Sequence, residues 1–455
     1  MSMLRGLVHS NSRGERVKIL STSANAPTPR TATWTALMCV VAMSSVTSTA
    51  FAEDTPLSLT VSQNLRHDSN LLRSTNARSD TVSTTAIQGD FNKAYGRQTY
   101  RASARLARAN YNRFESLDND ARALSASIGS DFGANWQATL NGSLNTSLNA
   151  PQDNPVNNRL LRNVRDYRDL GATLQYGVGG RWAIIGSYDT NRLRFSEDFA
   201  QLRNADQESA GLRAVYAASD LLSFGFGPRL VTTRFPQNLA NPENKDKNLD
   251  FTVNWRVTGL SSLNLLLSRR NTTAEQTNGT DRTINAFTGS LGWNYTPRGL
   301  LAYGVSLTRA TNADRFQNAQ NFTIGTGGNT SRTFLGVQNV AADTISTSLN
   351  LSSTARLTGK VSTSLSYGYT RFELTNDRSR SSTGVSVADQ LIGNNASSSS
   401  SSSRLQSLGW SVNYAAYRWL GVNCSLQYYD QTPDLNRPKF QGRSVDCGAN
   451  VTLDP

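Results

Sequence analysis

Apolar and polar residues alternate along most of the chain with a period of two. In the clearest stretch, Trp136 to Asn149, one set of alternate positions is mostly apolar and the other is wholly polar. The same alternation recurs over residues 249 to 256, 345 to 357 and 408 to 414. Because successive side chains of a β-strand point to opposite faces, this period predicts strands with one apolar and one polar face. No segment after residue 52 shows a sustained helical stripe of apolar residues.

About eighteen such segments can be marked, and the connections between them alternate in length. The segments start near residues 57, 81, 98, 121, 136, 169, 181, 206, 221, 248, 261, 283, 300, 342, 360, 404, 419 and 442. The short connections include turns at residues 177 to 180 and 258 to 260. The long polar loops include residues 149 to 167, 235 to 247, 311 to 341 and 375 to 403. We interpret the serine run 397 to 403 in the last loop as a flexible linker.

Short turns on one side and long loops on the other are typical of an outer-membrane β-barrel, with the turns in the periplasm. The alternative is a soluble β-sandwich or propeller, which also consists of strands and turns. A sandwich does not require connections that alternate in length, and its buried faces should be richer in Ile, Val and Phe. Five tryptophans also lie near short turns, as in an aromatic girdle: Trp136, Trp182, Trp255, Trp293 and Trp419. We therefore predict an all-β fold, one transmembrane antiparallel up-and-down barrel of about 18 strands. An even number of strands leaves both chain termini in the periplasm.

The average composition hides this pattern. Hydrophobic residues make up 37% of the chain and the mean hydropathy is −0.45, as in a soluble protein. The alternation shows that this mean averages two unlike faces. The longest apolar run, Ala36 to Met43, is far shorter than the roughly 20 residues of a membrane-spanning helix, which excludes a helical membrane protein.

The segment from Trp34 to Ala52 has the features of a secretory signal peptide, with basic residues upstream and an apolar core. We predict cleavage between Ala52 and Glu53, which makes residues 1 to 52 a signal segment and residues 53 to 455 the barrel. The stretch before Trp34 is long for such a segment, as it would be if translation started further downstream. Cleavage removes five of the 46 Lys and Arg and one of the 33 acidic residues, so the formal charge falls from +13 to +9. The predicted location is the outer membrane of a Gram-negative bacterium.

A barrel of about eighteen strands encloses a lumen wide enough for an aqueous channel, unless loops fold in to plug it. The polar phase that faces this lumen contains eight arginines: Arg66, Arg101, Arg105, Arg213, Arg229, Arg256, Arg270 and Arg356. The same phase holds four acids: Asp90, Asp131, Asp189 and Asp250. This excess of Arg predicts a weak attraction for anions. The alternative is that the arginines pair with these aspartates and brace the wall, which would leave about half of them free.

Two cysteines follow the signal segment, Cys424 and Cys447, and each lies in the apolar phase of its strand. A disulfide between adjacent antiparallel strands is geometrically possible there. An even number of cysteines also suits an exported chain. Two buried free thiols are the alternative.

Catalytic and metal-binding patterns are sparse. His67 is the only histidine after the signal segment, so a His-rich or Cys-rich metal cluster cannot be built. His67, Asp68 and Ser69 include the residue types of a nucleophilic triad, but consecutive residues of a strand point to opposite faces. A hydrolase would need partners elsewhere in the fold. We predict a non-enzyme with no cofactor and no metal.

The stretch from Arg66 to Arg73, Arg-His-Asp-Ser-Asn-Leu-Leu-Arg, resembles the N-terminal motif of EpsL-type proteins, which are porin-like outer-membrane β-barrels encoded in exopolysaccharide operons. Residues 95 to 98 and 111 to 114, and the terminal hairpin with both cysteines, resemble that family too. The resemblance spans essentially the whole predicted barrel and is sharp only in these parts. It implies a role at the outer membrane in making or secreting an exopolysaccharide, with no catalytic residue.

The leading hypothesis is therefore a barrel that acts in exopolysaccharide biosynthesis or export, as a conduit or accessory porin. Its expected partners are outer-membrane lipid, lipopolysaccharide, a polysaccharide that an Arg-bearing lumen would suit if acidic, and periplasmic polysaccharide-export proteins, with no nucleic acid. One alternative is a general or substrate-selective uptake porin. Another is a structural or adhesive surface barrel whose long loops are the working part.

Overall fold

The structure is a computed structural model of the chain. It describes residues 56–154, 158–238, 242–275, 281–297, 300–326, 330–382, 397–433 and 438–453. Within these ranges, residues 312–326, 330–344, 374–382 and 397–400 are described by their backbone alone. The predicted signal segment and its cleavage site at Ala52 and Glu53 lie outside the described residues.

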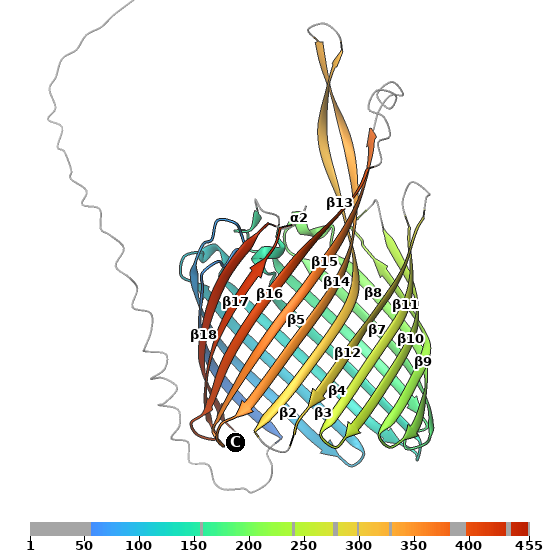
Figure 1. Cartoon of the computed structure of the whole chain (residues 1–455), viewed down its shortest axis with the longest axis vertical. Helices are drawn as coiled ribbons and strands as arrows, with labels where there is room; N and C mark the ends of the chain where they lie inside the picture. The colour runs from blue at the N-terminus through green and yellow to red at the C-terminus, as the bar shows by residue number, and fades with distance from the viewer. Residues whose placement is uncertain are drawn as a thin grey trace, which may run out of the picture. The chain divides into compact units, whose positions relative to one another are not determined.

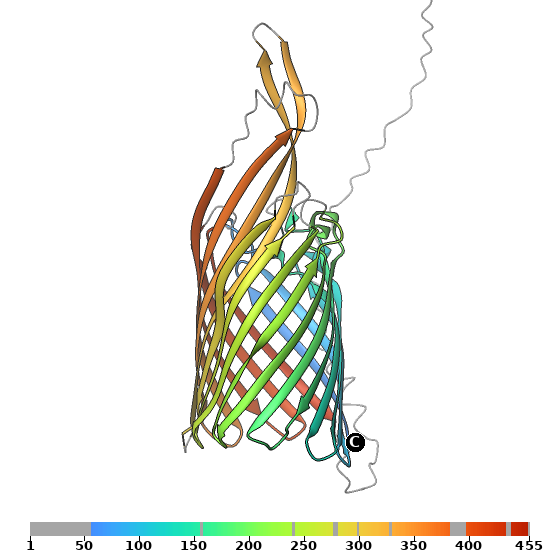
Figure 2. The same ribbon diagram turned by 90° about the vertical axis from the view of Figure 1, so that its right-hand side faces the viewer.

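Eighteen strands form one closed antiparallel sheet (Figures 1 and 2). In chain order they are β1 (Leu57–Asp68), β2 (Asp80–Tyr95), β3 (Gln98–Tyr111), β4 (Asn119–Phe132), β5 (Trp136–Leu148), β6 (Val164–Tyr176), β7 (Trp182–Phe195), β8 (Ala205–Ser219), β9 (Leu222–Arg234), β10 (Glu243–Thr258), β11 (Ser261–Ala274), β12 (Arg282–Tyr295), β13 (Leu301–Thr326), β14 (Thr330–Arg356), β15 (Val361–Ser382), β16 (Ser397–Ala415), β17 (Leu420–Gln431) and β18 (Phe440–Leu453). Each strand pairs with its neighbours in the chain, and β1 also pairs with β18. This closure confirms the predicted up-and-down barrel.

The apolar phase of the strands faces outward. Leu106, Leu212 and Phe287 lie within strands and are 62%, 56% and 71% exposed. A continuous surface of this kind is unfavourable in water and is matched by lipid. On β6, β11 and β13, the first charged residue of the outward face lies about eight residues from the short turn. The uncharged part of the strand between them gives an apolar band roughly 20 Å tall. The protein is therefore an outer-membrane barrel of a Gram-negative bacterium.

Aromatic rings gather at the end of the barrel that carries the short turns. Trp136 packs on Tyr176 with ring centroids 4.8 Å apart, and Trp182 packs on Tyr216 at 4.6 Å. Such rings suit the interface between lipid and water. Among the described residues, no helix is long and apolar enough to cross a membrane.

Several strands extend further at the long-loop end than the sequence predicts. Most of the predicted loop 311 to 341 belongs to β13 and β14, whose hairpin projects beyond the rest of the barrel (Figures 1 and 2). The serine run 397 to 403 forms the start of β16 and pairs with residues 372 to 378 of β15. The predicted flexible linker is therefore wrong, because backbone pairing does not require strand-forming side chains.

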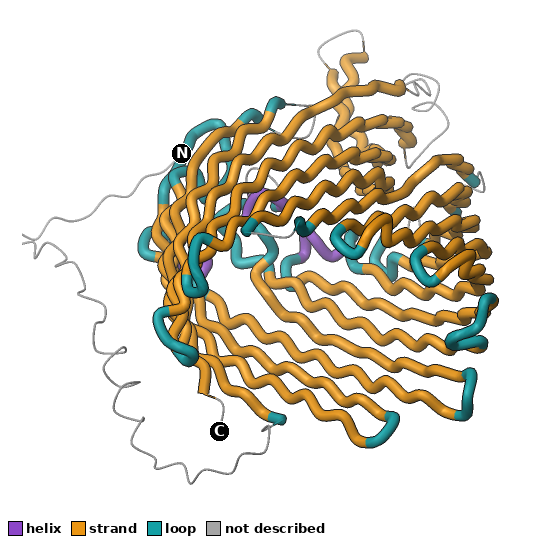
Figure 3. The backbone as a smooth tube through the Cα atoms, turned by 60° about the horizontal axis from the view of Figure 1, so that its bottom comes forward, coloured by secondary structure: helices purple, strands orange, loops and turns teal. Residues whose placement is uncertain are grey.

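The loops between the first eight strands carry three short helices: η1 (Glu115–Leu117), η2 (Pro151–Asp153) and α2 (Asp198–Gln201) (Figure 3). The loops after β1 and β3 contribute Leu72, Phe114 and Leu117 to a buried apolar cluster, and Leu148 at the end of β5 packs against it. We call the loops 69–79, 112–118 and 149–163 together the loop cluster.

Candidate functional site

All eight arginines that the sequence places in the polar phase lie on the strand face opposite the exposed apolar side chains. Arg213, for example, follows Leu212, which is exposed on the outer face. The arginines therefore face the lumen: Arg66 on β1, Arg101 and Arg105 on β3, Arg213 on β8, Arg229 on β9, Arg256 on β10, Arg270 on β11 and Arg356 on β14.

Three of these arginines form ion pairs within one strand or between adjacent strands: Arg66, Arg229 and Arg270. Arg229 Nε on β9 donates to Asp250 on β10 at 2.7 Å, and Ser268 Oγ on β11 donates to the same carboxylate at 2.6 Å. Arg66 pairs with Asp68, two residues further along β1, at 3.0 Å. These contacts brace the barrel wall, as the alternative to anion attraction predicts.

Arg270 braces a wider part of the wall. Its Nη2 donates to Asp246 on β10 at 2.6 Å, and its Nη1 donates to Thr311 Oγ1 on β13 at 3.0 Å. Thr272 Oγ1 donates to the same aspartate at 2.5 Å. A single guanidinium thus joins β11 to β10 on one side and to β13, across β12, on the other.

The other five lumen arginines have no carboxylate partner among the described residues. Arg105 donates to Gln88 Oε1 at 3.3 Å, and Arg256 donates to the backbone carbonyl of Asp220 at 2.9 Å. The guanidinium groups of three have neither a hydrogen bond nor an ion pair within the described ranges: Arg101, Arg213 and Arg356. Arginines that form ion pairs with the wall and arginines that do not therefore occur in the same lumen.

The lumen phase holds more carboxylates than the four that the sequence pattern identifies. Five further aspartates face the same way: Asp68, Asp80, Asp169, Asp246 and Asp446. The count of lumen arginines and acids therefore does not favour anions over the whole lumen. The charges are instead divided by sector. Strands β8 to β11 carry four arginines and two aspartates, both aspartates being in ion pairs. Strands β4 to β7 carry three aspartates and one arginine, Arg165 on β6, which faces the lumen in addition to the eight.

Asp68, at the loop end of β1, is fully buried and accepts hydrogen bonds from four groups. Arg66 and Arg73 donate at 3.0 and 3.1 Å. The backbone N–H of Asn70 donates at 2.9 Å and the hydroxyl of Tyr429 at 2.6 Å. Asp68 and Tyr429 are in the lumen phase yet 0% and 3% exposed, so loop residues cover them from the lumen side. The contact ties β1 to β17, across β18.

Arg73 is held on several sides. Its guanidinium lies 3.4 Å from the centroid of the Tyr429 ring and also contacts Asp68. Burial lowers the pKa of Arg73 to about 10, against the opposing attraction of Asp68, so the group stays charged at neutral pH. Its φ of 49° is unusual for a residue other than glycine. Arg159 supports this backbone by donating to the carbonyls of Leu72 and Arg73 at 3.1 and 2.8 Å.

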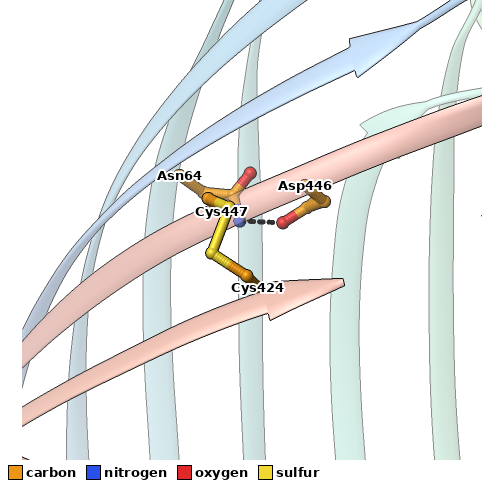
Figure 4. Close-up of a disulfide and its surroundings, with 4 residues drawn as sticks. All are labelled: Asn64, Cys424, Asp446 and Cys447. Atoms are coloured by element: carbon orange, nitrogen blue, oxygen red, sulfur yellow. Dashed lines mark hydrogen bonds between the residues drawn. A yellow bond between two sulfur atoms is a disulfide. The ribbon is translucent and has the colours of Figure 1, made fainter. Parts of the chain in front are cut away.

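The predicted disulfide is present between Cys424 on β17 and Cys447 on β18 (Figure 4). The two residues are directly opposite in register, with Cα atoms 4.1 Å apart, and both lie in the outward phase. In the next ladder, Asn64 on β1 donates to Asp446 on β18 at 2.5 Å. We call β17, β18 and β1 the seam, because here the last strands of the barrel meet the first.

No family model and no curated protein matches the chain. Similar solved structures include OprD of Pseudomonas aeruginosa, with 11% identity, a TM-score of 0.41 and coverage of 89% of this chain and 97% of that chain. The outer membrane protein OpdK of the same organism has 10% identity, a TM-score of 0.42 and coverage of 87% and 98%. The FrpB iron transporter of Neisseria meningitidis, in its apoprotein form, has 11% identity, a TM-score of 0.45 and coverage of 89% and 82%. These likenesses concern the barrel fold alone, and no matching family supports the EpsL-type designation.

The triad-like run is split between the two faces of β1, as predicted. His67 Nδ1 shares a hydrogen bond with Thr81 Oγ1 at 2.9 Å on the outer face, whereas Asp68 faces the lumen. Across the described ranges, no three His, Cys, Asp or Glu side chains come together as metal ligands would. Sequence reasoning missed Asp246 and Tyr429. Counting alternate positions back from Asp250 finds Asp246, but the sequence pattern predicts a loop over residues 235 to 247.

Proposed function

We propose that the protein is an outer-membrane channel that passes small hydrophilic solutes, which is the uptake-porin alternative. A barrel of 18 strands has room for an aqueous channel. The observation that carries the proposal concerns three arginines that face the lumen: Arg101, Arg213 and Arg356. Their guanidinium groups have no hydrogen-bond or ion-pair partner among the described residues. A charged group in that position needs water or a solute around it.

The test is conductance of the purified barrel in planar lipid bilayers. We expect stable, ohmic channels with weak ion selectivity, because arginines and aspartates are both numerous in the lumen phase. The folded state is checked by faster migration of unheated protein than of boiled protein on a detergent gel. Folded protein that inserts and conducts no current contradicts the proposal.

The second candidate is the exopolysaccharide role, which the resemblance of residues 66 to 73 favours. In that role the same lumen would pass a polymer, together with periplasmic export proteins. A clean deletion separates the two functions. Unchanged extracellular polysaccharide, with none retained in the periplasm, argues against export and leaves the channel proposal intact.

A further inference from the structure

A hollow of about 580 Å³ lies in the lumen wall, apart from the braced arginine pairs. Its lining comes from β6 to β8 and β10 to β13. Ile185 on β7 and Asn264 on β11 lie close to the short turns of their strands, which places the hollow in the periplasmic half of the lumen. A volume of this size is within the usual range of about 300 to 1,000 Å³ for small-molecule sites.

Arg213 is the one charged residue among those that line the hollow. Its Nε is buried and has no hydrogen-bond partner. The neighbouring Asp250 forms no hydrogen bond or ion pair with it among the described residues, and that carboxylate accepts from Arg229 and Ser268. The planar fork of the Arg213 guanidinium is therefore available to a ligand, and a carboxylate is the group that fits it best.

Glycines of the intervening strand β9 make room for this arrangement. A Cβ atom on Gly225 would overlap Thr252 Oγ1 and come within 3.0 Å of Arg213 Cδ. A Cβ atom on Gly227 would overlap the backbone carbonyl of Leu212. Because Gly225 lacks a side chain, the stem of Arg213 and the side chain of Thr252 can lie against β9. Gly227 allows the backbone of β8 to approach β9 closely.

The rest of the lining combines two kinds of surface. Amides and hydroxyls come from Gln175, Asn254, Asn264, Thr252 and Ser290. Aliphatic side chains come from Ile185, Val215 and Leu266. Amides and hydroxyls recognise the hydroxyl groups of a sugar, and an aliphatic patch suits the apolar C–H face of a sugar ring.

We propose that this hollow binds a sugar acid, a pyranose ring that carries one carboxylate, with the carboxylate on Arg213. The proposal rests on the proposed function, because the ligand must enter from solvent in the lumen. It goes further by giving the channel a site for one class of solute.

The test is equilibrium binding of glucuronate to the purified barrel in detergent, by calorimetry, with glucose as the neutral sugar of the same ring. We expect saturable binding of glucuronate that is stronger than binding of glucose. Arg213→Gln should weaken glucuronate binding about tenfold to a hundredfold, as the loss of a hydrogen-bonded charge does. Arg105→Gln is the matched control. Arg105 is also a lumen arginine without a carboxylate partner among the described residues, but it lies on β3, outside the hollow.

A second variant keeps Arg213 in place. Val215→Asp puts a carboxylate two residues from Arg213 on the same face of β8, the spacing at which Arg66 and Asp68 pair on β1. The internal pair should occupy the guanidinium and reduce glucuronate binding as strongly as Arg213→Gln does. Equal affinity for glucuronate and glucose overturns the proposal, as does an equal effect of Arg213→Gln and Arg105→Gln, or the absence of saturable glucuronate binding.

The failure of this site and the failure of the channel are distinguishable. Binding in detergent does not depend on conductance, so a barrel that conducts and does not bind glucuronate refutes the site alone. A barrel that binds glucuronate and conducts nothing refutes the channel and keeps the site.

Discussion

Two charged side chains inside the barrel, Asp68 beside the loop cluster and Arg213 in the lumen wall, have opposite surroundings. Asp68 is fully buried and accepts hydrogen bonds from four donors. Arg213 is half-buried, has an Nε without a partner and lines a hollow of about 580 Å³. By their positions along β1 and β8, both belong to the lumen-facing phase of the strands.

The difference follows from what covers each group. A carboxylate buried without donors costs several kcal/mol, so the loop that covers Asp68 must also supply its partners. Arg213 faces the lumen, where water or a solute can provide the partner. Polar groups under the loop cluster therefore stabilise the barrel, whereas an unpaired group of the lumen wall such as Arg213 is available for binding.

The largest expected effect is that of Asp68→Ala. Removing the carboxylate leaves Arg66 and Arg73 without their shared partner and should lower the free energy of unfolding by about 3 to 5 kcal/mol. The measurement is urea unfolding in lipid vesicles, followed by tryptophan fluorescence. Asp131→Ala is the matched control, since Asp131 is an exposed lumen aspartate that accepts only from Gln137. Equal losses for the two variants would show that Asp68 has no special structural role.

Removal of the disulfide measures how much this one covalent bond contributes to the stability of the seam. The bond closes a loop of 23 residues in sequence, so the double variant Cys424→Ser, Cys447→Ser should lose about 3 kcal/mol of unfolding free energy. The same urea titration measures it, and either single variant should lose as much as the double. A double variant as stable as the parent would show that pairing across β17 and β18 is sufficient without the bond.

Strand ends near the short turns could be predicted from the sequence, and strand ends at the other side could not. The expected starts at 136 and 261 agree with Trp136 and Ser261, where the alternation meets a turn. The expected starts at 342 and 404 fall well inside β14 and β16. Beyond the apolar band both faces of a strand meet water, so the period-two pattern fades while backbone pairing continues.

The phase of the lumen arginines was also predictable, but their partners were not. Period-two counting is enough to place Arg229 on the lumen face. Whether a partner is within reach depends on the register of neighbouring strands, and the partner of Asp68 on β17 is 361 residues away in sequence. Tyr429 meets Asp68 only because the barrel closes.

Tyr429→Phe tests this long-range contact with a smaller change. The ring and its packing on Arg73 remain, and only the hydroxyl that donates to Asp68 is lost. We expect a loss of about 1 to 2 kcal/mol in the free energy of unfolding, because three donors to the carboxylate remain. Tyr428→Phe is the control, since Tyr428 is exposed on the outer face of the same strand. A loss as large as that of Asp68→Ala would mean that the hydroxyl, and not the arginines, satisfies the carboxylate.

The smallest effects compare two arginines of adjacent strands, Arg229 on β9 and Arg213 on β8. Arg229→Gln removes the ion pair with Asp250, whose side chain is 13% exposed, and should cost about 1 kcal/mol after screening by lumen water. Arg213→Gln removes no side-chain hydrogen bond or ion pair within the described residues and should cost less than about 0.5 kcal/mol. Both residues face the lumen from adjacent strands. A difference between their two losses of unfolding free energy therefore reports the effect of the ion pair and not of the position in the barrel. Equal losses in the urea titration would mean that Arg213 is held by the wall, and a group held by the wall is not available to a solute.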